Sequence, residues 1–196
     1  MSISKLGPPQ MVGERWSDRG LTDIKEICVS HHAGLIDAIS MVYGGPDEDI
    51  IREHGEMNPR YNHSHIPFAL DEFLTRIHGY YLLNQHGYPE RLLSLGIDTN
   101  KNSYGPFGEG FSDGPQQLER YSFDIGSNRF RGFHGAVHNH SLSAIGVYVK
   151  KYISNSKNIE KIPPDPVTQT TQAQAQASMV QTRSRSKLRM GTMNQT

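Results

Sequence analysis

Two pairs of histidines in this chain have a spacing that is common in metal sites. His63 and His65 form one His-x-His pair, and His138 and His140 form the other. In a strand, residues two apart point to the same face, so each pair could offer two imidazoles to one ion. A metal site in a protein needs three or four ligands held by supporting hydrogen bonds. Each pair is therefore a candidate only if further ligands lie close to it.

Near His63 and His65, the candidate for a further ligand is Glu72. Glu72 and Gly79 follow at intervals that loosely resemble the first motif of the cupins. In cupins, however, the glutamate comes three or four residues after the second histidine, and a later segment supplies another histidine. The corresponding segment here, GIDTNKNSYGPFG (96–108), contains none. We therefore expect no metal and no cofactor, with most of the histidines in turns or at the surface.

Motifs of catalysis are weak in this sequence. The triplet from His138 to His140 spells the HNH nuclease signature, but three letters recur by chance and that site needs a metal-binding hairpin and helix. The sequence has no Gly-x-Ser-x-Gly elbow, no P-loop and no Gly-x-Gly-x-x-Gly after a strand. Cys28 lies in an apolar run and is more typical of a buried small hydrophobe than of a nucleophile. We expect no enzyme.

Composition limits the class of protein. The chain has 196 residues and a formal net charge of zero, which fits one globular domain with an appendage. The charge balance favours neither nucleic acid nor an anionic membrane as the main partner. The single cysteine excludes an internal disulfide framework. Because no charged-then-apolar leader and no apolar stretch of about 18 residues is present, the sequence favours a soluble protein made in the cytosol.

The character of the chain changes near residue 153. Beyond it come a proline-rich stretch (162–166), the polar run TQTTQAQAQAS and the basic run RSRSKLR (183–189), with no aromatic residue after Tyr152. Such a segment cannot bury enough apolar surface to offset the entropy of ordering. We expect residues 154–196 to form a disordered polar and basic tail. The basic run could be a nuclear import signal or a phosphate contact, although a solvated tail is favoured.

Residues 1–153 carry short apolar alternations bounded by turn residues, which are typical of strands. No segment shows sustained helical periodicity. At least eight strands at roughly 10-residue spacing indicate an all-β sandwich or barrel-like fold. Pro67 within one run argues for an edge strand or a strand start. The expected strands are 24–30, 35–43, 66–70, 75–83, 92–99, 119–125, 130–136 and 142–151, with a turn at 31–34.

Four longer motifs then narrow the class. They are LDEFLTRIHGYY (70–81), TNKNSYGPFG (99–108), GFHG (132–135) and LSAIGVYV (142–149). With them, the stretch from about residue 4 to 153 resembles a jacalin-related lectin domain of the mannose-binding type found in plants. The resemblance implies a β-prism of three antiparallel four-stranded sheets around a pseudo-threefold axis. The strand count agrees with this fold but does not distinguish it from a sandwich.

The resemblance also implies a carbohydrate site. The family loop before the last strand reads Gly-x-x-x-Asp-Ala-Ile-Gly, and the matching stretch here is 139–146. In the family, the Asp carboxylate accepts from two sugar hydroxyls, and the corresponding residue is Ser143. Backbone N–H groups of the loop donate to the sugar, and here these belong to His140 and Ser141. A glycine from the N-terminal loop completes the site and matches Gly13.

Several positions depart from the family pattern. Ser143 is shorter than aspartate and neutral, and losing the carboxylate would cost about 2–3 kcal/mol of binding, or about 30–150-fold. Asn139 replaces the loop glycine, and asparagine tolerates a positive φ better than most residues. The opening loop reads GPPQMVGERW (7–16). The stretch between an expected turn at His134-Gly135 and the last strand is one residue longer than usual.

The resemblance gives His138 and His140 a third interpretation, as residues that rim a remodelled sugar pocket. Solvated loop side chains are the alternative.

The expected function is that of a carbohydrate-binding lectin module, mannose/glucose-type, with an altered and weakened site. A degenerate lectin that acts as a protein-interaction or scaffold module in stress or defence responses is the alternative. The resemblance further implies a cytoplasmic or nucleocytoplasmic location and homo-oligomers, in which several weak sites would act together.

Overall fold

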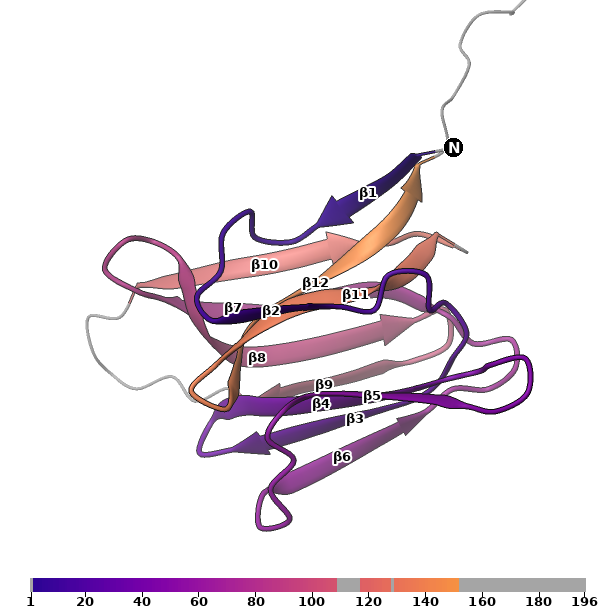
Figure 1. Cartoon of the computed structure of the whole chain (residues 1–196), viewed down its shortest axis with the longest axis horizontal. Coiled ribbons are helices and arrows are strands. Elements are labelled where there is room, and N and C mark those ends of the chain that lie inside the picture. The colour runs from indigo at the N-terminus through magenta and orange to yellow at the C-terminus, as the bar shows by residue number, and fades with distance from the viewer. Residues whose placement is uncertain (1, 109–116, 128, 152–196) are drawn as a thin grey trace, which may run out of the picture. The chain divides into compact units, whose positions relative to one another are not determined.

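The computed structural model describes residues 2–108, 117–127 and 129–151. These residues form twelve strands, and no helix occurs among them. The strands make three sheets of four, and every pairing is antiparallel (Figure 1). The prediction of an all-β prism with three four-stranded sheets is therefore confirmed.

Each sheet has its own strands, named here in spatial order. Sheet A contains β1 (Ser2–Leu6), β12 (Ser141–Lys151), β11 (Phe130–His138) and β2 (Glu14–Ser17). Sheet B contains β5 (Ile50–Gly55), β4 (Leu35–Tyr43), β3 (Ile24–His32) and β6 (Asn62–Pro67). Sheet C contains β10 (Leu118–Asp124), β7 (Leu74–Leu83), β8 (Pro89–Thr99) and β9 (Ser103–Gly108).

The three sheets repeat one plan. A central hairpin, β11–β12, β3–β4 or β7–β8, is flanked by two outer strands. In sheets A and B one loop joins the outer strands, and these loops cover residues 7–13 and 56–61. The tips of all three hairpins lie at the same end of the molecule, at the left in Figure 1. The fold therefore gathers loops from distant parts of the sequence at one end.

The core fills the space between the inner faces of the sheets. Long runs of the central strands are buried on both faces, as residues 141–147 are in β12, whereas β7 buries alternate residues such as Ile77, Gly79 and Tyr81. Two buried tyrosines use their hydroxyls to join sheets or strands: Tyr81 donates to the Ile145 carbonyl at 2.6 Å, and Tyr121 donates to the Ser94 carbonyl at 2.8 Å. The largest of the fully buried side chains are Tyr43, Tyr81, Phe133, Ile27, Ile36, Ile39, Met41, Ile66, Leu74, Ile77, Leu92 and Leu95.

Most of the predicted strands are confirmed, and three details were wrong. The strand expected at 66–70 is β6, which begins at Asn62 and ends at Pro67. It is an edge strand, as the proline indicated. His134 and Gly135 do not form a turn, because both are buried inside β11. The turn expected at 31–34 is shorter, since β3 continues to His32 and only Ala33 and Gly34 connect it to β4.

Four strands were not predicted at all. They are the outer strands β1, β2, β5 and β9. The tail expected at 154–196 lies outside the described residues. Within the part of the chain that the structure describes, no helix has the length and apolar character needed to cross a membrane.

Candidate functional site

The β11–β12 hairpin turns through Asn139 and His140. Their φ angles are +48° and +66°, and both residues are exposed. A two-residue hairpin of this kind requires positive φ at both positions, which asparagine and histidine adopt more often than most other non-glycine residues. The His140 carbonyl accepts a hydrogen bond from the Glu56 N–H at 2.8 Å. This bond ties the tip of the sheet A hairpin to the outer loop of sheet B.

Ser143 lies beneath this turn and is completely buried. Its hydroxyl donates to the Val12 carbonyl at 2.6 Å. It also sits at a register shift, because Ala136 pairs with Ala144 whereas Val137 pairs with Leu142. The hydroxyl at the position of the family carboxylate is therefore already engaged in holding the 7–13 loop against β12.

Gly13 ends the same loop and has a φ of +101°. A Cβ atom on Gly13 would lie 2.1 Å from the Val137 carbonyl oxygen, so only glycine allows the loop to approach β11 this closely. The structure thus brings Gly13 and Ser143 to the β11–β12 hairpin, as the sequence predicts. Sugar contacts of these residues stay a prediction.

Ser141 connects this hairpin to sheet B. It is buried, and its hydroxyl donates to Asp37 Oδ1 at 3.1 Å. Asp37 is only 7% exposed, and its other oxygen, Oδ2, is buried without a hydrogen-bond partner among the described groups. Burial raises the pKa of the Asp37 carboxyl, against the lowering effects of the Ser141 hydrogen bond and of nearby His32 and Arg91.

Asp37 was missed in the sequence, although a signal for it was present. The stretch AGLIDAIS (33–40) contains the Asp-Ala-Ile of the family motif, with alanine at the position of the glycine. Asp37 follows the turn of the β3–β4 hairpin as Ser143 follows that of β11–β12. Ala33 and Gly34 also have positive φ, +48° and +79°. Sheet B therefore carries a carboxylate at the place where sheet A carries a serine.

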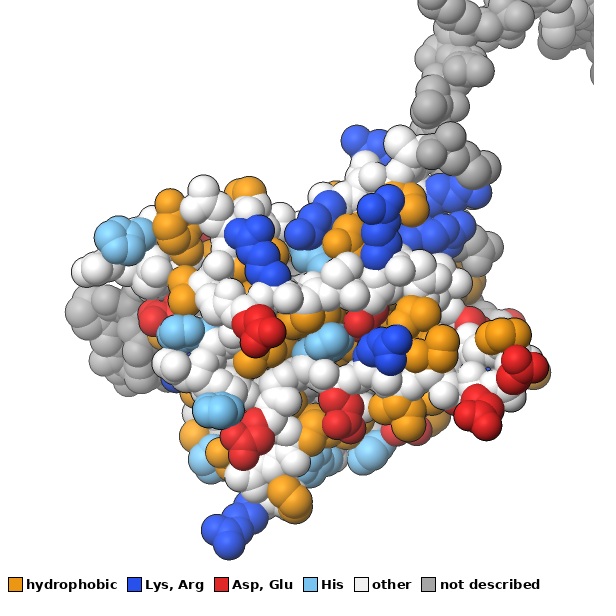
Figure 2. All heavy atoms as spheres, in the orientation of Figure 1, with side chains coloured by type: hydrophobic (Ala, Val, Ile, Leu, Met, Phe, Trp, Pro, Cys, Tyr) orange, Lys and Arg blue, Asp and Glu red, His pale blue; other side chains and the backbone are white. Residues whose placement is uncertain are grey.

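Histidines gather at the end where the hairpins turn, as Figure 2 shows by their pale-blue side chains. His138 Nε2 lies 3.9 Å from Glu90, and His140 Nδ1 lies 3.9 Å from Glu56. The His32 ring stacks on Tyr61 with a centroid distance of 4.4 Å. The His140 side chain is 84% exposed, whereas that of His138 is 29% exposed. The two histidines thus differ in their freedom to meet a ligand.

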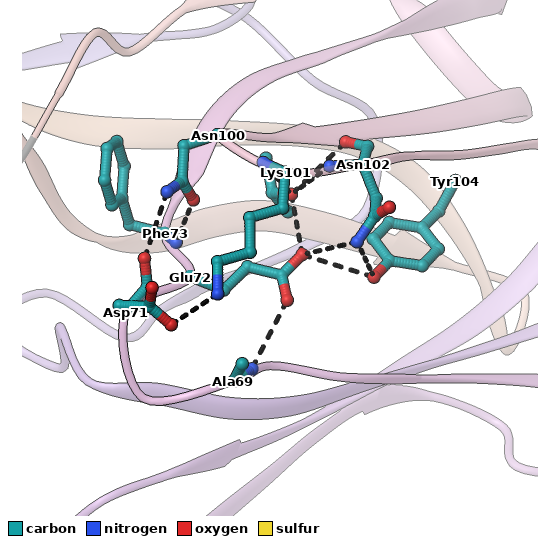
Figure 3. A network of polar contacts seen from close by, with 9 residues as sticks. Ala69, Asp71, Glu72, Phe73, Asn100, Lys101, Asn102 and Tyr104 are labelled. Carbon is teal, nitrogen blue, oxygen red and sulfur yellow. Dashed lines mark hydrogen bonds and ion pairs between the residues drawn. The ribbon is translucent and has the colours of Figure 1, made fainter.

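The first histidine pair does not converge on Glu72. His63 Nε2 contacts the Asn58 carbonyl at 2.9 Å, and His65 Nδ1 contacts Glu26 at 2.7 Å. Glu72 instead accepts hydrogen bonds from the Thr99 and Tyr104 hydroxyls at 2.6 and 3.2 Å (Figure 3). Over the described residues, no three His, Cys, Asp or Glu side chains come together as a metal-ligand set.

Cys28 is 6% exposed and its Sγ lies 3.7 Å from His65 Nε2. Burial raises the pKa of this thiol, and the charges of Glu26 and Glu53 add to the rise. Since the thiolate is the reactive form, the surroundings make Cys28 a poor nucleophile. The expectation that Cys28 is a buried apolar side chain is confirmed.

Known proteins share this fold and sequence pattern. Residues 6–148 match the family described as "Jacalin-like lectin domain". Jacalin-related lectin 3 of Arabidopsis thaliana is 30% identical over 150 residues, which are 74% of this chain and 24% of that protein. Jacalin-related lectin 2 of the same plant is 33% identical over 96 residues, which are 46% of this chain and 52% of that protein. The chain thus spans about half or less of these relatives.

Solved structures agree. A mannose-specific jacalin-related lectin from Morus nigra, solved in complex with mannose, superimposes with a TM-score of 0.58 at 26% identity, covering 77% of this chain and 93% of that one. Fold, motif match and relatives together define a β-prism lectin. The chain belongs to the jacalin-like lectin domain family.

Proposed function

We propose that the domain binds neutral glycans of the mannose/glucose type at the end where its hairpins turn. The Morus nigra relative binds mannose and supports this sugar class. We further propose that Asp37, rather than residue 143, supplies the carboxylate. Sugar hydroxyls would donate to Asp37, while backbone N–H groups of the neighbouring turns would donate to the sugar.

One observation carries this proposal. Asp37 Oδ2 is buried and has no partner within the described structure, and such an atom costs free energy until a donor reaches it. A sugar hydroxyl is a donor of the required kind. Ser143, in contrast, already spends its hydroxyl proton on the Val12 carbonyl. Its neutral oxygen would also bind hydroxyls less strongly than a carboxylate.

The test is a calorimetric titration of the full chain with methyl mannoside and a branched oligomannose. Asp37→Asn should weaken binding by about 30-fold or more, because charge-assisted hydrogen bonds are lost. Ser143→Ala should leave affinity nearly unchanged. Asp47→Asn, in an exposed loop, is the matched control. If Ser143→Ala abolished binding and Asp37→Asn did not, the site would lie at residues 139–143 instead.

A second function is favoured by the same buried serine. If the burial of Ser143 has abolished sugar binding, the domain is a scaffold for protein partners, as in the degenerate-lectin alternative. The native chain would then give no heat with either saccharide. A glycan array probed with clustered, folded protein would stay silent, whereas a clear mannose-type signal would contradict this alternative.

A further inference from the structure

Charge is unevenly divided among the three sheets. The strands of sheet A carry five basic residues and one acidic residue: Lys5, Arg15, Arg131, Lys150 and Lys151 against Glu14. In sheets B and C, carboxylates outnumber lysines and arginines. Within the described strands, sheet A is therefore positively charged, and sheets B and C are each slightly negative.

The strand register places several of these cations on the outer face of sheet A. Lys5 pairs with Tyr148, and Lys150 follows two residues later on the same side of β12. Ser17 Oγ donates to the Tyr148 hydroxyl at 3.1 Å, and the Arg19 guanidinium lies 5.8 Å from the centre of the Tyr148 ring. Tyr148 thus marks the middle of this outer face.

The exposed cations of this face lack carboxylate partners. Lys5, Arg15 and Arg19 are exposed, and no ion pair of the described residues involves any of the three. Lysines and arginines in other parts of the molecule do pair, as Lys25 does with Asp49 at 2.5 Å. Figure 2 shows Lys and Arg side chains gathered over β1 and its neighbours. We name Lys5, Arg15, Arg19, Tyr148 and Lys150 the basic face.

We propose that the basic face binds an anionic polysaccharide, such as a polymer of uronic acids. Lys5 and Arg15 lie on the two edge strands of sheet A, three strand spacings of about 4.8 Å apart, and Arg19 follows β2, so the cations form an open, flat array spread across the sheet. A flat array suits a polymer with repeated charges better than it suits a small anion, which needs an enclosing pocket. Each ionic contact is weak, and several together give an affinity that decreases as the salt concentration rises.

One observation disfavours a membrane, and one argument favours a polysaccharide. Ile3 is the one large hydrophobic side chain recorded as strongly exposed in the strands of sheet A, so the face offers little to insert into a membrane. The second reason rests on the proposed function: a chain that holds neutral sugars at the hairpin end gains affinity if its basic face engages charged residues of the same polymer.

The experiment measures binding of the full chain to polygalacturonate as a function of salt. The triple variant Lys5→Gln/Arg15→Gln/Arg19→Gln should weaken binding by at least about tenfold and lower the log–log salt slope by about 2. The control triple Arg52→Gln/Arg60→Gln/Arg120→Gln removes the same charge from exposed positions outside sheet A. Equal weakening by both triples, or no binding by the native chain, would overturn the basic face as a site.

Further measurements test which polyanion binds the basic face and whether the two proposed sites are independent. Duplex DNA or phosphatidylserine vesicles should compete less well than polygalacturonate, and better competition by either would overturn the choice of polysaccharide. Asp37→Asn should leave polygalacturonate binding intact. If methyl mannoside binding fails while the basic-face triple still weakens polygalacturonate binding, the hairpin-end proposal falls and the basic face stands.

Discussion

Gly13 shows how much of the hairpin end depends on one missing methyl group. We expect Gly13→Ala to destabilise the protein by about 2–4 kcal/mol, because the new Cβ would clash with the Val137 carbonyl and the φ of +101° is strained for alanine. Urea unfolding measures this loss. Gly20→Ala is the matched control, since Gly20 has a φ of +99° but nothing within 4 Å of an added Cβ. A loss as large at Gly20 would mean that strain, not the contact, sets the effect.

Single residues also show where sequence reasoning stops. The resemblance led to Ser143 through the motif at 139–146 and to Gly13 through the N-terminal loop, and the structure does bring both to one hairpin. Side-chain burial was not predictable, because the Ser143–Val12 bond joins segments 131 residues apart. Asp37 could have been predicted from the Asp-Ala-Ile motif at 37–39, but the absence of a hydrogen-bond partner for its Oδ2 among the described groups follows only from three-dimensional packing.

At the scale of elements, the polar network of Figure 3 fastens the loop before β7 to the loop between β8 and β9. Glu72 Oε1 accepts from the Thr99 and Tyr104 hydroxyls, and Asn100 Oδ1 accepts from the Phe73 N–H at 2.8 Å. Lys101 pairs with Asp71 across the same gap. These bonds fix two irregular segments that contribute no strand pairing of their own.

We expect Glu72→Gln to cost about 1–2 kcal/mol of unfolding free energy, because an amide has one acceptor oxygen where the carboxylate has two. The rate of amide hydrogen exchange should rise at residues 99–102, because their N–H groups donate hydrogen bonds within or next to this loop. Glu119→Gln, at an exposed position of β10, should change stability by less than about 0.5 kcal/mol. Unchanged exchange in the Glu72 variant would show that the network is not what orders the loop.

Elements differ in how well the sequence predicts them. The central strands are predicted from long apolar runs that are buried, as residues 141–147 are in β12, or from alternation, as at Ile77, Gly79 and Tyr81 in β7. The missed strands are outer ones of four to six residues with mostly exposed or half-exposed side chains, such as β2 and β5. These strands form because they hydrogen-bond to a neighbouring strand, so their own sequences show no apolar alternation that would predict them.

For the whole molecule, stability should depend on pH through a buried histidine. Burial, aided by the charge of Lys5, lowers the pKa of His134 to about 4, although its bond to the Leu6 carbonyl opposes the shift. The unfolded chain would protonate this imidazole near its ordinary pKa of about 6.5. Protonation therefore favours unfolding, and stability that is full above pH 6.5 should fall by up to about 3 kcal/mol as the pH drops to 4.

Urea unfolding of the native chain and of His134→Gln at pH 7.5 and 4.5 measures this effect. The variant should lose much less stability than the native chain between the two values. Asp37 acts in the opposite sense, because its raised pKa favours the folded state as the pH falls, but it is common to both proteins. Equal losses would assign the pH dependence to groups other than His134.

The three-sheet plan was accessible from the sequence only through the resemblance, since short alternating strands also suit a sandwich. The division of charge was not accessible, because composition reports a sum and sheet A is assembled from both ends of the described chain. Only after β1 and β12 pair do Lys5 and Lys150 come to share one face.

The same pairing has an architectural consequence. Ser2 lies opposite Lys151, so the described chain begins and ends at neighbouring points on sheet A, at the strand ends remote from the β11–β12 turn. Chain segments joined directly to Ser2 and to Lys151 would thus start from one corner of the domain, away from the hairpin tips. Such domains can be linked in series with their hairpin loops exposed. The distance between the loops of neighbouring domains then depends on the length of the linker.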